Sequence, residues 1–425
     1  MLIYNPMATK LNPCELEIDL FCKGISINES CTLEQDARLF SRTRAGLGSG
    51  LELIIPGDLK DIWMNVPVEE EFAKSTPYHL IKEKTNYFVL DNRDSNLKYP
   101  VRVPPNPKWY FAKTTRGTPM TQIGVLQGTY LGVYIGECCK FWKYPEKLQC
   151  KFCTSGINIG THEIEEKEVS DVVEVAQIAK AQSGVTFVHF NSGYQGDRGL
   201  EVVAPYVKAM REKVGVLVGV QAIPSNELYK YDWLIDLGAN HFSFCYEFHN
   251  PDYFAKYLPG KEKIIGQKTF FNALEYTATK LGKGRCSGEI IAGVEPVEDT
   301  LKAIDYITDI GAFPTICIFR PLIGSSMENA PSPTYEDMKT VMHHMYQSCM
   351  KKGLPIGMAP NIEVSLVVQP DDAQYLVPRT SSFYLYKLKL KSLKTLAKPL
   401  FKKQLQPQEV KTNEFDSSSY SPSSV

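Results

Sequence analysis

Apolar and polar positions follow two different periods from Thr121 onward. Short runs rich in β-branched and aromatic residues have the length of buried strands, and the segments between them space apolar residues as amphipathic helices do. The pattern predicts strands over residues 124–127, 130–136, 185–190, 216–222, 241–247, 286–292 and 314–320. It predicts helices over residues 168–181, 199–213, 226–237, 267–281, 296–310 and 334–352. Asn226 is the expected N-cap of the third helix, which should stop at Gly238.

This alternation of strand and helix predicts parallel strands joined by helical crossovers. We expect an α/β fold with a partial or full (β/α) TIM-like barrel. A doubly wound open sheet is the alternative, but no Gly-x-Gly-x-x-Gly follows a strand. The expected organisation is an N-terminal α+β cap over residues 1–120, the barrel over 121–365 and a C-terminal extension over 366–425.

The first 120 residues are rich in proline, so long helices are not expected there. Residues 51–56 and 86–90 have the pattern of short strands. The glycine-rich loop 44–50 follows Arg38, Arg42 and Arg44, and its backbone N–H groups could hold an anion. A tight loop with solvated arginines is the interpretation we favour.

The C-terminal extension has a basic segment. Residues 384–403 combine seven lysines with regularly spaced leucines, which is typical of a basic amphipathic helix. Such a helix could make a weak contact with an anionic membrane surface. Packing of the leucines on the protein itself is the favoured interpretation. The chain after Gln404 has the composition of a disordered tail.

Composition and charge exclude some classes of protein. Hydrophobic residues make up 43% and charged residues 22% of the chain, as in ordinary globular proteins. The formal net charge of -1 gives no basic field for nucleic acid. We find neither a signal peptide at the start nor a run of about 20 apolar residues. The 11 cysteines are an odd number, which favours a reducing compartment, so a cytoplasmic protein is expected.

Four of these cysteines lie between residues 138 and 153. Cys150 and Cys153 form a Cys-x2-Cys pair, and Cys138 or Cys139 precedes it by one loop. Three thiolates suit a zinc ion or an iron–sulfur cluster. Closed zinc sites need a fourth ligand, and adjacent cysteines rarely point at one ion. A cluster held by three cysteines would leave one iron free to bind a small molecule. Such an open iron is what a ligand site at the mouth of a barrel would require.

Polar or glycine-containing segments also follow the other predicted strands. Because the carboxyl ends of parallel strands meet at one edge, these segments should form a continuous rim around a ligand site. The candidate rim residues are Asn191, Ser192, Gly193, Glu247, Gly293, Glu295 and Arg320.

The cysteine segment resembles the signature of the radical SAM superfamily, Cys-x3-Cys-x2-Cys with an aromatic residue before the last cysteine. Cys150, Phe152 and Cys153 match the second half. The first half departs, because ten residues separate Cys139 from Cys150. The segment is loosely similar to an uncharacterised bacterial group of nitrilase-cluster radical SAM proteins, in which the start of the motif favours Cys139 over Cys138. The resemblance covers about residues 121–330.

The resemblance implies a cofactor set and a reaction. Cys139, Cys150 and Cys153 would hold a [4Fe-4S] cluster, whose open iron would bind S-adenosylmethionine. An electron from a donor such as flavodoxin or ferredoxin would cleave this cofactor to a 5′-deoxyadenosyl radical, which takes hydrogen from a small-molecule substrate. The substrate and the reaction type are not indicated.

The resemblance also implies roles for the rim. Asn191, Ser192 and Gly193 would hold the methionine amino group, although the usual acidic residue is missing. Glu247 would contact the ribose, and Phe152 and Gly293 the adenine. Glu295 closes an incomplete adenine motif, and Arg320 ends the sixth strand. The alternative function is a zinc-stabilised binding or scaffold protein. A metal-dependent hydrolase is disfavoured, because no His-x-His lies at a strand end.

Overall fold

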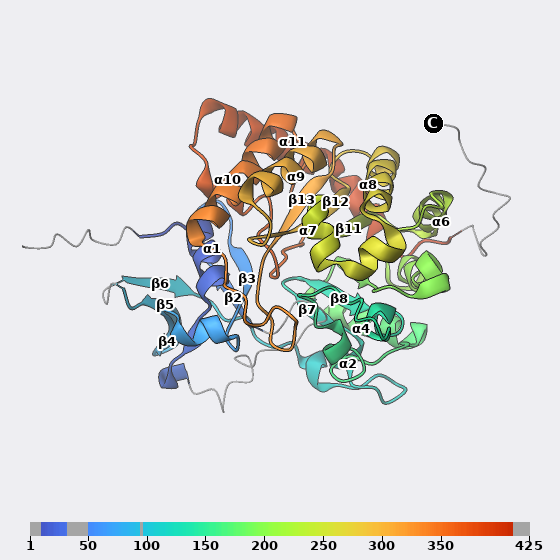
Figure 1. Ribbon diagram of the computed structural model, residues 1–425, viewed down its shortest axis with the longest axis horizontal. Helices are drawn as coiled ribbons and strands as arrows, with labels where there is room; N and C mark the ends of the chain where they lie inside the picture. Colours follow the sequence, from blue (N-terminus) through green and yellow to red (C-terminus); the bar gives the residue numbers. More distant parts are fainter. Residues whose placement is uncertain (1–9, 32–49, 94–96, 411–425) are drawn as a thin grey trace, which may run out of the picture.

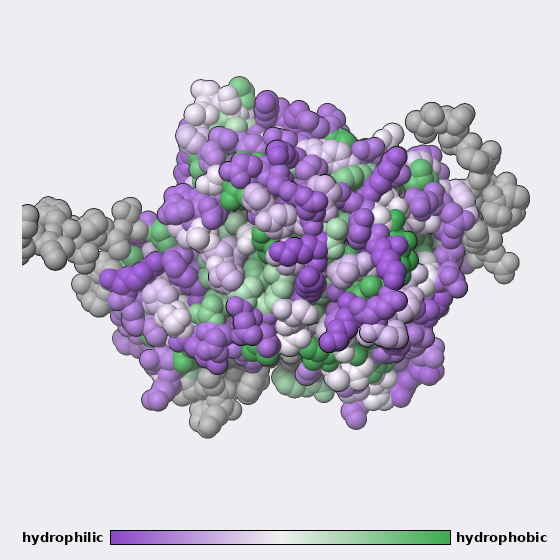
Figure 2. All heavy atoms as spheres, viewed as in Figure 1, coloured by the Kyte–Doolittle hydropathy of each residue, from purple (hydrophilic) through white to green (hydrophobic). Residues whose placement is uncertain are grey.

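The computed structural model describes residues 10–31, 50–93 and 97–410. The three arginines and nearly all of the glycine-rich loop considered as an anion site lie outside these ranges, as does the segment 411–425 of the predicted disordered tail. Polar side chains cover most of the face shown in Figure 2, and apolar side chains form only small groups on it.

A curled seven-stranded sheet forms the centre of the fold. Its spatial order is β13-β12-β11-β10-β9-β8-β7, so neighbours in space are neighbours in sequence. The six strands from β8 to β13 pair in parallel, and β7 pairs with β8 antiparallel. The strands are β7 Val125–Gln127, β8 Tyr130–Tyr134, β9 Phe187–Asn191, β10 Leu217–Gln221, β11 His241–Glu247, β12 Cys286–Ala292 and β13 Phe313–Ile318. The predicted partial barrel is confirmed, and the sheet is open between β7 and β13.

Helices join the parallel strands and cover the sheet (Figure 1). They are α4 Val169–Ser183, α5 Ala204–Ala209, α6 Tyr229–Leu237, α7 Pro251–Tyr257, α8 Gln267–Leu281, α9 Val297–Asp309 and α10 Tyr335–Lys352. In α4, Val172, Val175, Ala176 and Ala179 are buried at the three- and four-residue spacing that the sequence pattern requires.

The start of α6 differs from the prediction. The helix begins at Tyr229 with Leu228 as its N-cap, so the assignment of Asn226 as the cap is wrong. The backbone N–H of Leu228 instead donates to the Asn226 carbonyl at 3.1 Å, and the Glu227 N–H donates to Ser225 Oγ at 3.1 Å. A polar turn therefore uses these groups before the helix starts.

The N-terminal region contains a small sheet, a hairpin and a helix. The sheet has the order β1-β4-β5-β6 and lies at one end of the molecule in Figure 1. Its strands are β1 Ser26–Ile27, β4 Tyr78–Glu83, β5 Asn86–Asp91 and β6 Leu97–Val101, and the hairpin consists of β2 Leu51–Ile55 and β3 Ile62–Val66. Both predicted strands are present, as β2 and β5.

One helix of this region was not predicted. Helix α1, Pro13–Lys23, has 11 residues despite the surrounding prolines. Its start is fixed by a capping box, in which Asn12 accepts from the Glu15 N–H and the Glu15 carboxylate accepts from the Asn12 N–H. Pro13 occupies the first helical position, where a missing N–H costs nothing. The prolines therefore did not exclude a helix of three turns.

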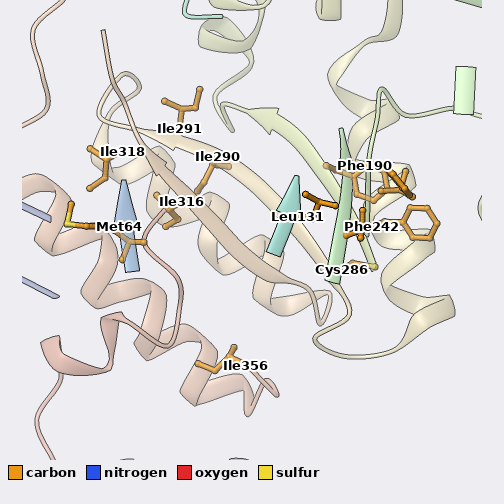
Figure 3. Packing of buried hydrophobic residues seen from close by; sticks show 14 of the residues in the cluster. Met64, Leu131, Phe190, Phe242, Cys286, Ile290, Ile291, Ile316, Ile318 and Ile356 are labelled. Carbon is orange, nitrogen blue, oxygen red and sulfur yellow. The ribbon is translucent and has the colours of Figure 1, made fainter. Parts of the chain in front are cut away.

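A single buried cluster joins this region to the barrel. It runs from Cys14 in α1 through the hairpin to the strands of the large sheet. Figure 3 shows Met64 of β3 on the same side of the core as Ile316 and Ile318 of β13. The Arg320 side chain, two residues beyond β13, donates to the Asn65 carbonyl at 2.7 Å. The two regions are packed together, and the boundaries drawn at residues 120 and 365 stay a prediction.

An extended segment spans the open side of the sheet. Val368 forms an antiparallel bridge with Ile316 of β13. At its other end, the carbonyl of Glu363 accepts from the Thr129 N–H at 3.0 Å, in the turn between β7 and β8. Between them, Ser365 accepts from the Asn65 N–H of the hairpin at 2.6 Å. Residues 361–370 thus connect both edges of the half-barrel.

The C-terminal helix α11 covers Ser381–Gln404, which confirms the predicted helix. It packs on α10 through Phe383 and Tyr386, whose rings contact Tyr346, and through the buried Leu390. The expected packing of the other leucines is wrong, because Leu385, Leu388, Leu396 and Leu400 are exposed. No helix within the described ranges is long and apolar enough to cross a membrane.

Candidate active site

The cysteine loop follows β8, the first parallel strand of the barrel. Gly136 turns the chain with a φ of +90°, which favours glycine. The loop then places Cys139, Cys150 and Cys153 on the wall of one cavity of about 620 Å³ that continues into the barrel interior. The three cysteines are free of disulfides.

Cys139 is held against the end of β9. The Tyr194 backbone N–H donates to Cys139 Sγ at 3.3 Å. A Cβ atom at Gly193 would lie 2.4 Å from the Cys139 Cβ, so only glycine allows the two segments to approach this closely. The glycine turn after β9 and the cysteine loop after β8 therefore form one unit.

Cys138 points elsewhere. It packs in a small buried cluster with Tyr134 and Ile159, against Trp142, and is not on the cavity wall. Burial, and then the nearby Glu165 carboxylate, raises the pKa of its thiol to about 11. These surroundings make Cys138 a packing residue.

The three cavity cysteines are close enough to influence one another electrostatically. Burial, followed by the charge of Cys153, raises the pKa of Cys139 to about 11, and burial also raises the pKa of Cys150. Cys153 Sγ lies 3.1 Å from Ser155 Oγ. In the described part of the chain, no three His, Cys, Asp or Glu side chains are grouped to hold a single metal ion.

The donor chemistry of this site fits an iron–sulfur cluster. Thiolates are the usual ligands of such clusters, and here three thiols from one loop open onto the same cavity. Buried thiols with raised pKa values lose their protons when a metal centre binds them. Cys139, Cys150 and Cys153 can therefore supply three ligands from one side of the cavity.

A buried ion pair lies beside the cysteines. Glu247 ends β11 with a φ of +66° at a β-bulge, and its Oε1 is 2.9 Å from Lys261 Nζ. Lys261 Nζ also donates to the Cys245 carbonyl at 2.5 Å. Burial is the largest single influence and would lower the pKa of Lys261, but the Glu247 carboxylate together with Cys150 and Cys245 raises it. The positive charge of Lys261 in turn opposes the rise in the pKa of Cys150.

The glycine turn after β9 lies on the cavity wall, as the sequence predicts. Asn191, Ser192 and Gly193 all line it. Ser192 Oγ donates to the Ile135 carbonyl at 2.9 Å, which fixes the turn against β8. The Asn191 Oδ1 atom is buried and has no hydrogen-bond partner among the described residues. Asn191 thus presents an available acceptor.

Phe152 and Arg320 also line the cavity. The Phe152 ring packs edge-on against Phe248, with 6.1 Å between ring centroids. Arg320 is 3.6 Å from Glu70, an ion pair that joins the rim to the N-terminal region. Arg320 therefore has a structural role in addition to its position on the wall.

Gly293 and Glu295 lie away from this wall. A Cβ atom at Gly293 would come within 2.2 Å of Pro333, which packs against it. Glu295 Oε2 accepts from the backbone N–H groups of His249 and Asn250 at 2.9 and 3.0 Å. Burial raises the pKa of Glu295 to about 7. This carboxyl group supports the turn after β11.

The interior of the barrel holds a polar layer that sequence reasoning missed. Glu289 of β12 is half-buried, accepts from Ser243 and Gln221, and lies 3.0 Å from Cys245 Sγ. Burial raises the pKa of its carboxyl group. The available signal was a single charged residue in the otherwise apolar run Cys286–Ala292, at an inward-facing position.

A layer of rings lies below the polar layer. His189 stacks on Phe187 at 5.5 Å, and His241 stacks on Phe313 at the same distance. Burial lowers the pKa of His189 to about 3, and its Nε2 has no partner among the described side chains and backbone groups. His189 is buried and lines the cavity.

Comparisons with known proteins bear on this arrangement. The chain is 24% identical over 256 residues to the bacteriochlorophyllide c C-7(1)-hydroxylase of Chlorobaculum limnaeum. The match covers 53% of this chain and 61% of that protein, so the chain spans less than two thirds of the length of its curated relative. No protein-family model matches.

Two solved structures are similar to part of this chain. Methylornithine synthase (PylB) is 18% identical and covers 51% of the chain and 62% of its own, with a TM-score of 0.39. A radical SAM methyltransferase from Sphaerobacter thermophilus is 11% identical and covers 64% and 75%, also with a TM-score of 0.39.

Proposed function

We propose that this chain is a radical SAM enzyme that binds a [4Fe-4S] cluster through Cys139, Cys150 and Cys153 and acts on a small molecule in the barrel cavity. The observation that carries the proposal is the opening of three thiols from one loop onto a cavity that continues between the strands. When bound, the cluster would supply the electron for reductive cleavage of S-adenosylmethionine, and with it radical hydrogen-abstraction chemistry at the substrate. A reduced donor of the flavodoxin or ferredoxin type would provide that electron.

The residues after β9 and β11 bind S-adenosylmethionine. Asn191 has a free acceptor oxygen, which suits the methionine amino group, and the Ser192–Gly193 turn lets the cofactor approach the backbone. The Glu247 carboxylate would accept hydrogen bonds from the ribose hydroxyls, and Lys261 pairs with this carboxylate inside the cavity. Phe152 would pack against the adenine.

Gly293, Glu295 and Arg320 act through other residues. Glu295 orients the turn that follows Glu247 by accepting from His249 and Asn250. Arg320 fixes the rim to the N-terminal region through Asn65 and Glu70. We therefore assign these residues positioning roles in place of direct contact with the cofactor.

The polar layer contacts the substrate. Glu289, Gln221 and Ser243 lie on neighbouring strands and share hydrogen bonds on the barrel side of the sheet. Because its surroundings raise the pKa of its carboxyl group, Glu289 can donate as well as accept a hydrogen bond in the cavity. The surrounding barrel excludes water from the radical.

Anaerobic reconstitution with iron and sulfide tests the proposal. We expect about four iron and four sulfide ions per chain, a brown colour and, after reduction, an electron paramagnetic resonance spectrum that changes when S-adenosylmethionine is added. Release of 5′-deoxyadenosine would complete the evidence. A colourless protein that retains zinc and no iron would contradict the proposal and support the zinc-stabilised alternative.

A further inference from the structure

Helix α11 exposes an unusual amount of apolar side chain. Ten large hydrophobic side chains are exposed in the described part of the molecule, and half of them belong to this one helix. Their exposed fractions lie between 54% and 76%. The five residues are Tyr384, Leu385, Leu388, Leu396 and Leu400. The spacing of the four leucines keeps them on one side of the helix.

The charge of this helix has one sign. Residues 381–404 contain seven lysines and no aspartate or glutamate. Lys391, Lys402 and Lys403 are exposed. Exposed leucines interspersed with lysines are the pattern of a helix that lies in the plane of an anionic lipid surface. A protein partner that used these leucines would have to bury the neighbouring lysines, which is costly without acidic partners.

The exposed face reaches the cavity. Leu400, Phe401 and Gln404 of α11 line the same cavity as the cysteines. They lie at its opposite end, together with Leu217, Asn240 and Gly284, where the barrel strands begin. Leu400 is both exposed and part of the cavity wall. The face of α11 is therefore continuous with the lower end of the barrel.

We propose that the exposed face of α11, formed by its four exposed leucines and Tyr384 with the surrounding lysines, docks the protein on an anionic membrane surface. The leucines enter the boundary between headgroups and acyl chains, and the lysines contact anionic headgroups. The lower end of the barrel cavity then faces the membrane. This proposal does not depend on the chemistry proposed for the cysteines.

Vesicle co-sedimentation with the full chain tests the docking face. One set of vesicles contains phosphatidylcholine alone, and the other also contains about one third phosphatidylserine. Two double variants probe the face: Leu388→Ser with Leu396→Ser, and Lys391→Gln with Lys403→Gln. Two controls match them on exposed positions elsewhere, Phe111→Ser with Ile323→Ser, and Lys268→Gln with Lys351→Gln. Circular dichroism checks that every variant is folded.

We expect the wild type and both controls to bind the anionic vesicles, and salt to release them. Each α11 variant should show at least a tenfold lower partition coefficient. The proposal is overturned if the wild type does not bind anionic vesicles, or if the α11 variants bind as the controls do. It is also overturned if light scattering shows a dimer that the leucine variant alone dissociates, because the face would then join two copies of the chain.

Discussion

At the scale of single residues, two adjacent cysteines show how the path of the backbone decides whether a side chain lines the cavity or packs in the core. Cys138 and Cys139 carry the same side chain, and the sequence left their order of preference to a family resemblance. The structure separates them, because Cys139 lines the cavity beside Gly193 whereas Cys138 packs against Tyr134 and Ile159. The direction in which the Cys139 side chain leaves the loop depends on contacts with Gly193 and Tyr194, more than 50 residues away, which the local sequence pattern does not contain.

This difference predicts opposite outcomes for two substitutions. Cys139→Ser should abolish retention of the iron–sulfur cluster, because it removes one of three ligands. Cys138→Ser should retain about as much iron as the wild type and lose only some stability. Iron and sulfide analysis after anaerobic reconstitution distinguishes them. Loss of iron in the Cys138 variant alone would reverse the assignment.

The Glu247–Lys261 pair yields a prediction about stability. Both side chains are largely buried, so Lys261→Met leaves a carboxylate in the cavity without its cation. We expect the free energy of unfolding to fall by about 3–5 kcal/mol. The double variant with Glu247→Gln should recover most of this loss, because it removes the uncompensated charge. Urea denaturation measures both, and equal instability of the single and double variants would contradict a buried ion pair.

At the scale of elements, the sequence correctly predicted the strands and helices that hydrophobic periodicity and local polarity determine. The parallel strands and their crossover helices follow from runs of apolar residues, and the partial barrel was correct for that reason. Helix α1 was not predicted, because frequent prolines argue against long helices, although Asn12 and Glu15 form a capping box and Pro13 fits the first helical position. The segment 361–370 could not be predicted, since its partners lie in β3, β13 and the turn between β7 and β8.

The carboxyl group that supports the turn between β11 and α7 gives a pH prediction. The pKa of Glu295 is raised to about 7, so the folded protein binds a proton there that the unfolded chain releases above its ordinary value of 4.5. The contribution of this group to stability is therefore present below pH 4.5 and is lost as the pH rises towards 7.

Glu295→Gln tests this linkage. The amide oxygen can still accept from the His249 and Asn250 N–H groups, but it does not titrate. Relative to the wild type, the variant should gain stability between about pH 5 and about pH 8, by about 1–3 kcal/mol. Denaturant unfolding at the two pH values measures the difference. A variant with the same pH profile as the wild type would show that Glu295 does not cause the effect.

At the scale of the whole molecule, the half-barrel is completed by parts that lie outside it in sequence. The hairpin of β2 and β3, the segment 361–370 and the edge strand β13 meet at the open side of the sheet. One buried cluster includes residues from all of them. The sequence predicted a separate N-terminal cap, because the pattern of apolar and polar positions changes near Thr121. Composition, however, does not reveal whether two regions of a chain share one hydrophobic core.

A shared core predicts that the N-terminal region and the barrel unfold together. The four tryptophans provide reporters, because Trp63 lies in β3 and Trp233 in α6. Variants that keep only Trp63 or only Trp233, with the others replaced by phenylalanine, should each show one urea transition by fluorescence. In each variant, this transition should coincide with the transition by far-ultraviolet circular dichroism. If the Trp63 signal changes at a lower urea concentration than the circular dichroism of the same protein, the N-terminal region is an independent unit. Coincident transitions would mean that ordering of the hairpin and closure of the barrel's open side are one event, because the Arg320–Asn65 contact and the Ser365–Asn65 contact are lost together.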